Sequence, residues 1–369
     1  MLDQGRIQDA WASGLDDVVA AGTRLSHVDG EAGQLTLAGR PVEAWAGSRF
    51  SALVLTLWRL AGAQGLPVSP QALERQMGKA RVEAHKVLPA LRARAACLSP
   101  IEALMAGLAL MGDEGDDTPL VRAVGAAPVF VAGAVRMAQG LDPLAPDPSA
   151  EPVADYLRLL RGETAAPGDV DALTVYLITV ADHGLNASTF AARVAASTRA
   201  GALSASVAAV ATLKGPLHGG APGPVLDMLD AIGTVERTHE WVEDALARGD
   251  RLMGFGHRIY RVRDPRADVL KAQVERLAGD NPRLAFAGEV ERHIVRLLRE
   301  LKPDRPLDTN VEFYTAVLLE ALRIPRAAFA ATFAVGRIAG WTAHIVEQER
   351  VGRLIRPQSV MVTGDPAYV

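Results

Sequence analysis

The 369-residue sequence has one cysteine, Cys97, and only 5% aromatic residues. A single thiol excludes an internal disulfide framework and is typical of a protein in a reducing compartment. The N-terminus, MLDQGRIQDAWASG, carries charges where a signal peptide would need an apolar run. No charge-free apolar stretch reaches the ~18 residues that span a bilayer. The sequence therefore predicts a soluble cytoplasmic protein with no membrane segment.

The sequence also lacks an excess of basic residues, since its formal net charge is −4. It therefore has no basic field for nucleic acid or an anionic membrane. The eight histidines are dispersed, H-E-x-x-H is absent, and one cysteine cannot build a zinc site, so no metal is predicted. There is no Walker loop, and GFGHRI lacks the third glycine of a dinucleotide fingerprint.

Apolar residues, many of them alanine, recur mostly at helical spacing. This pattern predicts a buried helix at 50–62 that Gly62 closes, and two helical segments within 69–97 broken near Pro89. Further helices are predicted at 120–140, 152–162, 170–181, 187–213 and 328–346. The one strand signal, SHVDGEAGQLTLAG at 26–39, predicts at most a small hairpin. The expected class is therefore all-α, with a small N-terminal β-hairpin.

The composition changes at 215–224, GPLHGGAPGP, where glycine and proline prevent an ordinary helix interior. The chain beyond it is more charged until an apolar helix returns at 328–346. This pattern predicts a larger domain, 1–222 plus 329–369, with a smaller domain, 223–328, inserted into it. The Gly/Pro stretch would be one hinge between them.

Four stretches combine a functional side chain with turn chemistry. In ADHGLNAST, His183 lies between two predicted helices, with Asn186 and Ser188 as possible caps. In KGPLHGG, glycines around His218 would let the backbone approach a ligand closely. Taken singly, His183 is as readily a hydrogen-bonded histidine at a helix end, and His218 a turn residue at a domain boundary.

The third stretch is GFGHRIYRVRDPR, in which four arginines follow His257: Arg258, Arg261, Arg263 and Arg266. It is either an anion-binding loop or a solvated basic loop. In the fourth stretch, NVEFYTAVLL, Asn310 would cap a helix and place Glu312 in its first turn. A first-turn glutamate is commonly there for helix stability alone.

Together these stretches resemble the citrate synthase family. The resemblance rests on DHGLNASTFAARVAAST, LKGPLHGGA, MGFGHRIYRVRDPRA, NVEFYTAVL, GRIAGWTAHIVEQ and RLIRP, which occur in the family's order and at its spacing over about residues 14–364. It implies an almost entirely helical fold of two domains that close over the substrates. The length is similar to the shorter, dimeric members.

The resemblance implies condensation of acetyl-CoA with oxaloacetate and hydrolysis of the thioester, an acyltransferase reaction of the EC 2.3.3 type in the tricarboxylic acid cycle. No cofactor is implied beyond coenzyme A as part of the substrate. By position, His218 resembles the donor to the thioester oxygen, His257 the donor to the ketone, and Glu312 the base. The implied substrate-binding residues are His183, Arg266, Arg337 and Arg356, with Arg261 as a CoA-phosphate contact. In family dimers the equivalent of Arg356 reaches across from the partner, which implies a homodimer.

Glu312 stands where most of the family has aspartate. It remains a carboxylate, but one added methylene extends its reach by up to about 1.5 Å. A misplacement of ~1 Å can cost roughly a hundredfold in rate. Since every other polar role is filled, we expect the backbone to be set back to accommodate the longer side chain.

Two alternatives stay open at the level of sequence. A 2-methylcitrate synthase using propionyl-CoA would have nearly the same motifs, because one methylene is worth only ~1–3 kcal/mol of discrimination. A catalytically silent paralogue that binds oxaloacetate or acyl-CoA would explain Glu312 and the altered stretch after His218. It predicts ligand-induced closure without turnover.

Overall fold

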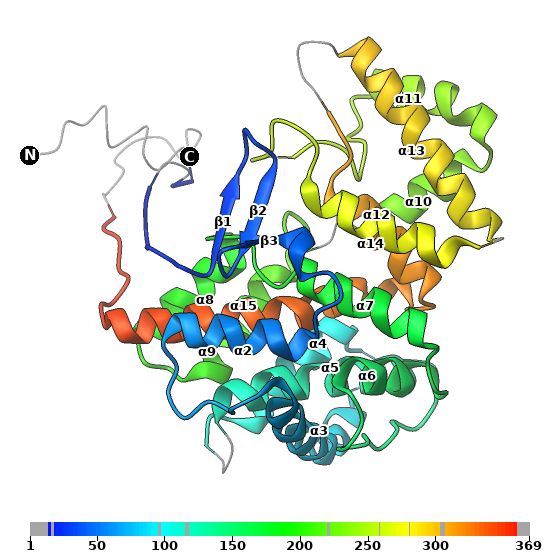
Figure 1. Ribbon diagram of the computed structural model, residues 1–369. Coiled ribbons are helices and arrows are strands. Elements are labelled where there is room, and N and C mark those ends of the chain that lie inside the picture. Colours follow the sequence, from blue (N-terminus) through cyan, green and yellow to red (C-terminus); the bar gives the residue numbers. More distant parts are fainter. Residues whose placement is uncertain are drawn as a thin grey trace, which may run out of the picture.

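The computed structural model describes residues 14–15, 18–94, 97–114, 118–219, 222–257, 259–279, 281–302 and 307–359. Helices dominate it (Figure 1), as the sequence predicts. The elements before residue 215 are β1 Ser26–Asp29, β2 Gln34–Leu37, β3 Arg40–Pro41, η1 Val42–Trp45, α2 Phe50–Ala61, α3 Pro70–Arg92, α4 Pro100–Met111, α5 Pro119–Ala138, α6 Pro152–Arg161, α7 Pro167–Thr179, α8 Ala187–Ser197 and α9 Ala202–Leu213. Those after it are α10 Pro222–Ile232, η2 Val235–Arg237, α11 Thr238–Ala247, α12 Pro265–Ala278, α13 Pro282–Leu301, α14 Val311–Ala321, η3 Arg326–Ala328 and α15 Phe329–Val351.

The predicted hairpin is present and gains a third short strand. β1 pairs antiparallel with β2, and β2 with β3. The turn between β1 and β2 is held by Asp29, whose Oδ1 accepts the backbone N–H groups of Glu31 and Ala32 at 3.1 and 2.8 Å. Leu35 and Leu37 of β2 point into the core, which gives the sheet one buried face.

The core is built around α15, nearly every turn of which is buried. It packs against α2, α5, α7, α8 and α9. Glycines let it approach the end of α7, since a Cβ at Gly336 would lie 2.6 Å from Val180 Cγ2. Trp58 of α2 donates to Thr342 Oγ1 at 2.9 Å, which satisfies its indole N–H inside the core.

Helices α10 to α14 form the upper right part of the molecule in Figure 1. Within this group α14 packs on α10 and α12, and α13 packs on α11 and α12. α12 also packs against α7 and β2, which lie in the N-terminal half of the chain. The division into domains at 223 and 328 stays a prediction.

Two details of the helix prediction were wrong. α3 runs unbroken from Pro70 to Arg92 through Pro89. Leu88 and Leu91 on either side of Pro89 are buried, and this packing outweighs the roughly 3 kcal/mol that an interior proline costs. The segment 187–213 is two helices, because Arg199 and Gly201 adopt positive φ angles. The Asp113 carboxylate then accepts the Leu203 N–H at 2.7 Å and caps α9.

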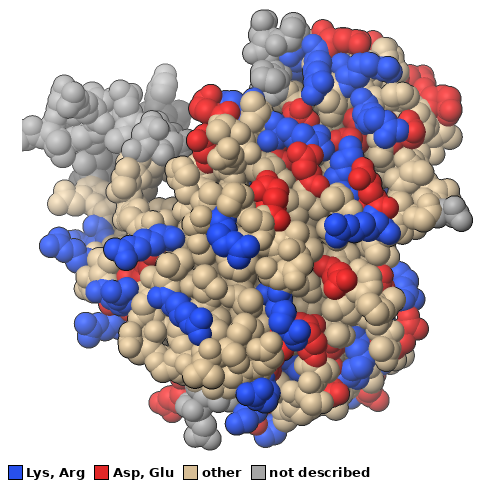
Figure 2. All heavy atoms as spheres, viewed as in Figure 1, with Lys and Arg blue, Asp and Glu red and all other residues tan. Residues whose placement is uncertain are grey.

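Of the described helices, α5 is long and apolar enough to cross a membrane. However, 83% of its apolar window is buried inside the fold. It therefore has the character of a core helix. On the face in Figure 2, basic and acidic side chains are intermixed, in keeping with the small net charge.

Candidate active site

Residues from five separate parts of the chain meet at one place. The rings of His183, after α7, and His257, before α12, lie 5.6 Å apart between centroids. Arg266, in the first turn of α12, approaches His257 with 3.2 Å between Nη2 and Nε2. Glu312 of α14 is close enough to Arg266 and Arg337 for both cations to act on its pKa. The structure thus brings these predicted residues together.

Glu312 lies where the sequence places it, in the first turn of α14. Asn310 is the N-cap, and its side-chain oxygen accepts the Glu312 N–H at 3.0 Å. The Oε2 atom of Glu312 is buried and has no hydrogen-bond partner among the described residues. The pKa of Glu312 is raised to about 7, chiefly by burial and also by Asp264, while Arg266 and Arg337 oppose the rise. A carboxylate with a free oxygen and a pKa near neutrality is suited to general base catalysis.

His257 has a defined tautomer. Its Nδ1 accepts the backbone N–H groups of Ile259 and Tyr260 at 3.0 and 3.1 Å. The ring proton of the neutral imidazole therefore sits on Nε2. Burial and the neighbouring Arg266 lower the pKa of His257 to about 4. In this tautomer the Nε2–H and the Arg266 guanidinium are both donors, so neither satisfies the other and both can donate to the same acceptor oxygen of a ligand.

His218, after α9, faces the start of α8. Its Nε2 lies 2.8 Å from Ser188 Oγ and accepts the Ser188 N–H at 3.4 Å. The Ser188 N–H contact fits the tautomer with its proton on Nδ1, an atom that has no protein partner in the described part of the chain. Burial, together with Arg337, lowers the pKa of His218 to about 4. At neutral pH this side chain is therefore neutral, and in that tautomer it donates through Nδ1.

His183 is buried, and burial lowers its pKa well below the usual value, with Arg266 and Arg337 adding to the effect. Its Nε2 lies 3.1 Å from the Tyr260 hydroxyl. This contact links the end of α7 to the loop that carries His257. His183 is thus a neutral side chain at physiological pH, and its ring is held in place by the Tyr260 hydroxyl.

The two buried cations differ in how they are neutralised. Arg266 makes a two-pronged ion pair with Asp264, at 3.0 Å to Oδ1 and 2.8 Å to Oδ2. Arg337 donates through Nε to the Val180 carbonyl, and its guanidinium lies 4.6 Å from the Phe333 ring centroid. Burial lowers the pKa of Arg337 to about 10, so it stays charged at pH 7. A cation whose terminal nitrogens have no described partner is suited to binding an anionic oxygen.

Two predicted residues are not in this cluster. Arg261 is exposed on the loop after His257, and its backbone N–H donates to the Gly30 carbonyl at 3.0 Å. Arg356 is exposed in the segment after α15. Both predicted roles, at a CoA phosphate and across a dimer interface, stay predictions. Arg258 of the same basic loop, and residues 220–221 of the Gly/Pro stretch, lie outside the described residues.

Sequence reasoning missed Tyr260, Asp264 and Trp341. Asp264 is the N-cap of α12, and the D-P pair before a helical pattern could have marked it. Ser188 was expected only as a cap, but its Oγ contacts His218 and also accepts the Trp341 indole N–H at 3.2 Å. Tyr260 and Trp341 carry no local signal, because their partners lie far away in the sequence.

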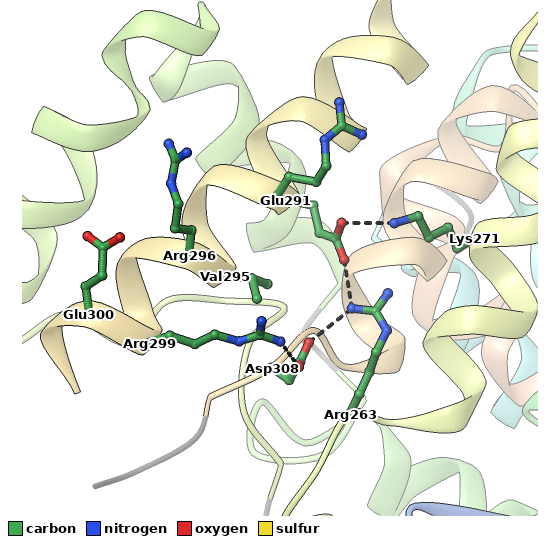
Figure 3. Close-up of a pocket in the computed structure, with 9 residues that line it drawn as sticks. Arg263, Lys271, Glu291, Val295, Arg296, Arg299, Glu300 and Asp308 are labelled. Carbon is green, nitrogen blue, oxygen red and sulfur yellow. Dashed lines mark hydrogen bonds and ion pairs between the residues drawn. The ribbon is translucent and has the colours of Figure 1, made fainter. Parts of the chain in front are cut away.

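A pocket of about 530 Å³ lies away from the histidines, between α12, α13 and the segment before α14. Its charged side chains largely pair with one another (Figure 3): Arg263 donates to Glu291 and Asp308, and Lys271 to Glu291. These pairs anchor the loop after His257 to α13. In the described part of the chain, no cluster of three or more His, Cys, Asp or Glu side chains could hold a metal ion.

The comparisons with known proteins agree with one another. A family model described as citrate synthase, C-terminal domain, matches residues 14–358. A putative citrate synthase 2 of Mycobacterium tuberculosis (strain H37Rv) is 37% identical over 98% of this chain and 95% of its own length. A citrate synthase of Synechocystis is 33% identical, over 96% of this chain and 91% of its own length.

Solved structures give the same result. A citrate synthase from Thermotoga maritima is 32% identical, with a TM-score of 0.83 over 96% of this chain and 97% of that chain. A ternary complex of carboxymethyl coenzyme A and oxaloacetate with the citrate synthase of Thermoplasma acidophilum is 27% identical. Its TM-score is 0.84, over 97% of this chain and 98% of that chain.

Proposed function

The chain belongs to the citrate synthase family, an acyltransferase family of the EC 2.3.3 type, and from this premise we propose that it condenses acetyl-CoA with oxaloacetate to give citrate and CoA. The observation that carries the proposal is the buried, unpartnered Oε2 of Glu312, on a carboxyl whose pKa is raised to about 7. It lies beside two cations and near neutral imidazoles that can donate protons. This set supports removal of a proton next to a carbonyl group.

The proposed first step is enolisation. Glu312 takes a proton from the methyl carbon of acetyl-CoA, and His218 donates through Nδ1 to the thioester oxygen, on which negative charge develops. A neutral imidazole is suited to this role, because it donates a hydrogen bond without adding a charge to a site that already holds two arginines. General acid–base catalysis of this kind typically contributes 10²–10⁴-fold.

The proposed second step is carbon–carbon bond formation. The enolate carbon attacks the ketone carbon of oxaloacetate, and the ketone oxygen takes up the proton from Nε2 of His257. Glu312 then gives the proton it took to solvent, and His257 regains one from solvent, so both groups return to their starting states. Arg266 and Arg337 hold the substrate carboxylates, with His183 beside them. Water then cleaves the thioester of citryl-CoA, which releases citrate and CoA thiol. No cofactor is needed beyond CoA as part of the substrate.

Further parts of the proposal concern assembly and motion. We propose a cytoplasmic homodimer, in which Arg356 completes each site from the other subunit and Arg261 contacts a CoA phosphate. We also propose that residues 223–328 act as a small domain that closes over the substrates. Support comes from the cluster itself, since Glu312, His257 and Arg266 lie within that segment while His183, His218 and Arg337 lie outside it.

The test is CoA thiol release by purified protein from acetyl-CoA, with and without oxaloacetate, and then from propionyl-CoA. Oxaloacetate-dependent release, with a higher kcat/KM for acetyl-CoA, is expected. A strong preference for propionyl-CoA would instead assign 2-methylcitrate synthesis. Oxaloacetate binding in calorimetry without turnover of either thioester would favour a silent binder.

A further inference from the structure

We propose that the turn of the N-terminal hairpin, residues 29–33, is the docking surface of the loop that carries His257, and that Gly30 is a positioning residue of the reaction. The proposal rests on the proposed function, because it concerns the same site. The hairpin has so far no role: it supplies none of the side chains assigned to substrate. The hairpin nevertheless contacts both the segment that carries His183 and the loop that carries His257.

The tip of the hairpin contacts the loop through its backbone. The Arg261 N–H donates to the Gly30 carbonyl at 3.0 Å. A Cβ at Gly30 would lie 2.5 Å from the carbonyl oxygen of Ile259, a distance that real Cβ atoms do not adopt. Gly30 does not have a positive φ. Glycine is therefore required there by the close approach of the two backbones, not by the turn conformation.

The contacted residues are those that set the orientation of His257. The N–H groups of Ile259 and Tyr260 hold the Nδ1 atom of His257, and the Tyr260 hydroxyl contacts His183. A displacement of the Ile259–Arg261 backbone would therefore move the imidazole proton on Nε2 away from its acceptor. The contact between Gly30 and Arg261 thus acts on the Nε2–H donor of His257 through the two hydrogen bonds that Ile259 and Tyr260 make to its Nδ1 atom.

The base of the hairpin is fixed to the other histidine. Ser26 of β1 donates to Asp182 Oδ2 at 2.6 Å and accepts the Gly184 N–H at 2.9 Å. These two residues flank His183 directly. One rigid hairpin therefore spans from the His183 segment at Ser26 to the His257 loop at Gly30, and sets the relative position of the two rings.

The loop is itself anchored on its far side. Arg263 donates to Asp268 of α12, to Glu291 of α13 and to Asp308 before α14. Figure 3 shows Arg263 reaching Glu291 and Asp308. The loop and these helices therefore form one unit, and the hairpin tip is where that unit meets the N-terminal part of the chain.

The experiment compares Gly30→Ala and Gly30→Val with Gly22→Ala. Gly22 is a matched control, because it also lacks a positive φ and has no atom within 4 Å of its added Cβ. Hydrogen–deuterium exchange of peptides covering 259–263 is measured by mass spectrometry on the unliganded protein. Oxaloacetate affinity and kcat/KM are measured on the same samples, together with Tm.

For Gly30→Ala we expect a Tm close to that of the wild type, at least tenfold faster exchange in the 259–263 peptide, and a tenfold or greater loss of oxaloacetate affinity and kcat/KM. The affinity falls because fewer molecules have the binding-competent loop position. In Gly30→Val the increase in exchange and the losses of oxaloacetate affinity and kcat/KM should be larger than in Gly30→Ala. Gly22→Ala should match the wild type in all of these measurements. Equal exchange in Gly30→Ala and Gly22→Ala would overturn the inference. A wild-type protein without turnover, but with the expected exchange difference, would instead refute the proposed function alone.

Discussion

The Oδ2 atom of Asp264 accepts the backbone N–H of Val311 at 3.1 Å, one residue before Glu312. The same oxygen accepts Nη2 of Arg266 at 2.8 Å. One carboxylate therefore joins the first turns of α12 and α14, and places the Arg266 cation beside the candidate base. Asp264 also raises the pKa of Glu312.

Asp264→Ala should destabilise the protein and shift its pH profile. Loss of one partner of a buried ion pair costs about 3–5 kcal/mol, because the Arg266 charge stays buried. The pKa of Glu312 should fall, since a negative neighbour is removed and Arg266 is no longer neutralised. Urea unfolding and the pH dependence of kcat/KM check both effects. Asp268→Ala is the control: Asp268 is an exposed partner of Arg263, so we expect a loss of about 1 kcal/mol or less and an unchanged pH profile.

Glu312→Gln should lower kcat by roughly 10²–10⁴-fold while oxaloacetate still binds. The amide keeps the shape of the side chain but cannot take the proton. CoA thiol release and calorimetry on the same preparation check this. Glu320→Gln on the same helix breaks partly exposed ion pairs with Arg283 and Arg326, and should retain wild-type turnover. Residual activity near the wild-type level in Glu312→Gln would remove Glu312 from the role of base.

The rate should depend on pH through Glu312. Because its pKa is raised to about 7, the carboxylate becomes protonated, and so inactive as a base, as the pH falls through that value. Below it, kcat/KM should fall about tenfold per pH unit. His218 and His257, with pKa values of about 4, should not contribute to this limb. A limb centred near pH 4.5 would mean that burial does not raise the pKa of Glu312.

Stability should depend on pH with two opposite contributions. The pKa of Glu312 is about 7 in the fold against 4.5 when unfolded, so its stabilising effect is complete below 4.5 and is lost as the pH rises through 7. The pKa values of His218 and His257 are about 4 in the fold against 6.5, so their contribution is complete above 6.5 and is lost as the pH falls towards 4.

Glu312→Gln separates the two contributions to the pH dependence of stability, because it removes that of Glu312 and leaves that of His218 and His257. The free energy of unfolding at pH 7 minus that at pH 5 should be about 2 kcal/mol more positive in Glu312→Gln than in the wild type. Urea unfolding at the two pH values measures it, with Glu320→Gln as the control. The same difference in Glu312→Gln and wild type would contradict the raised pKa without any reference to activity.

Arg356 can be tested by mixing two inactive variants. If Arg356 acts across the dimer, exchange of subunits between Arg356→Ala and Glu312→Gln should restore about a quarter of the wild-type sites. Half of the dimers would be mixed, and each mixed dimer would hold one intact site. An Arg356 that serves its own subunit gives no recovery. The assay is CoA thiol release after co-refolding, with sedimentation to confirm dimers.

Local signals in the sequence were enough to place several features correctly. Asn310 as a cap, Glu312 in the first turn of α14, and Gly62 at the end of α2 follow from rules that involve neighbouring residues only. The all-helical class with its hairpin follows from hydrophobic periodicity in the same way. The resemblance to a family supplied the grouping of distant histidines and arginines.

Features that depend on distant partners could not be read from the sequence. The helix through Pro89 is explained by the burial of Leu88 and Leu91, and the break before α9 by Asp113, about 90 residues earlier in the chain. The direction in which the Arg263 side chain points was equally hidden. A basic loop predicts an anion site until its acidic partners on other helices are known.

Helix α15 is synthesised after the other elements that carry candidate site residues before residue 329. Its buried residues complete the core, and it carries Arg337 close to the C-terminal end of the chain. Since chains emerge from the ribosome with the N-terminus first, His183, His218, His257 and Glu312 are all synthesised before this helix. A translation product that stops before α15 would therefore lack both the central packing element and the Arg337 cation. Such a fragment would be cleared as an unfolded chain instead of competing with finished enzyme for substrate.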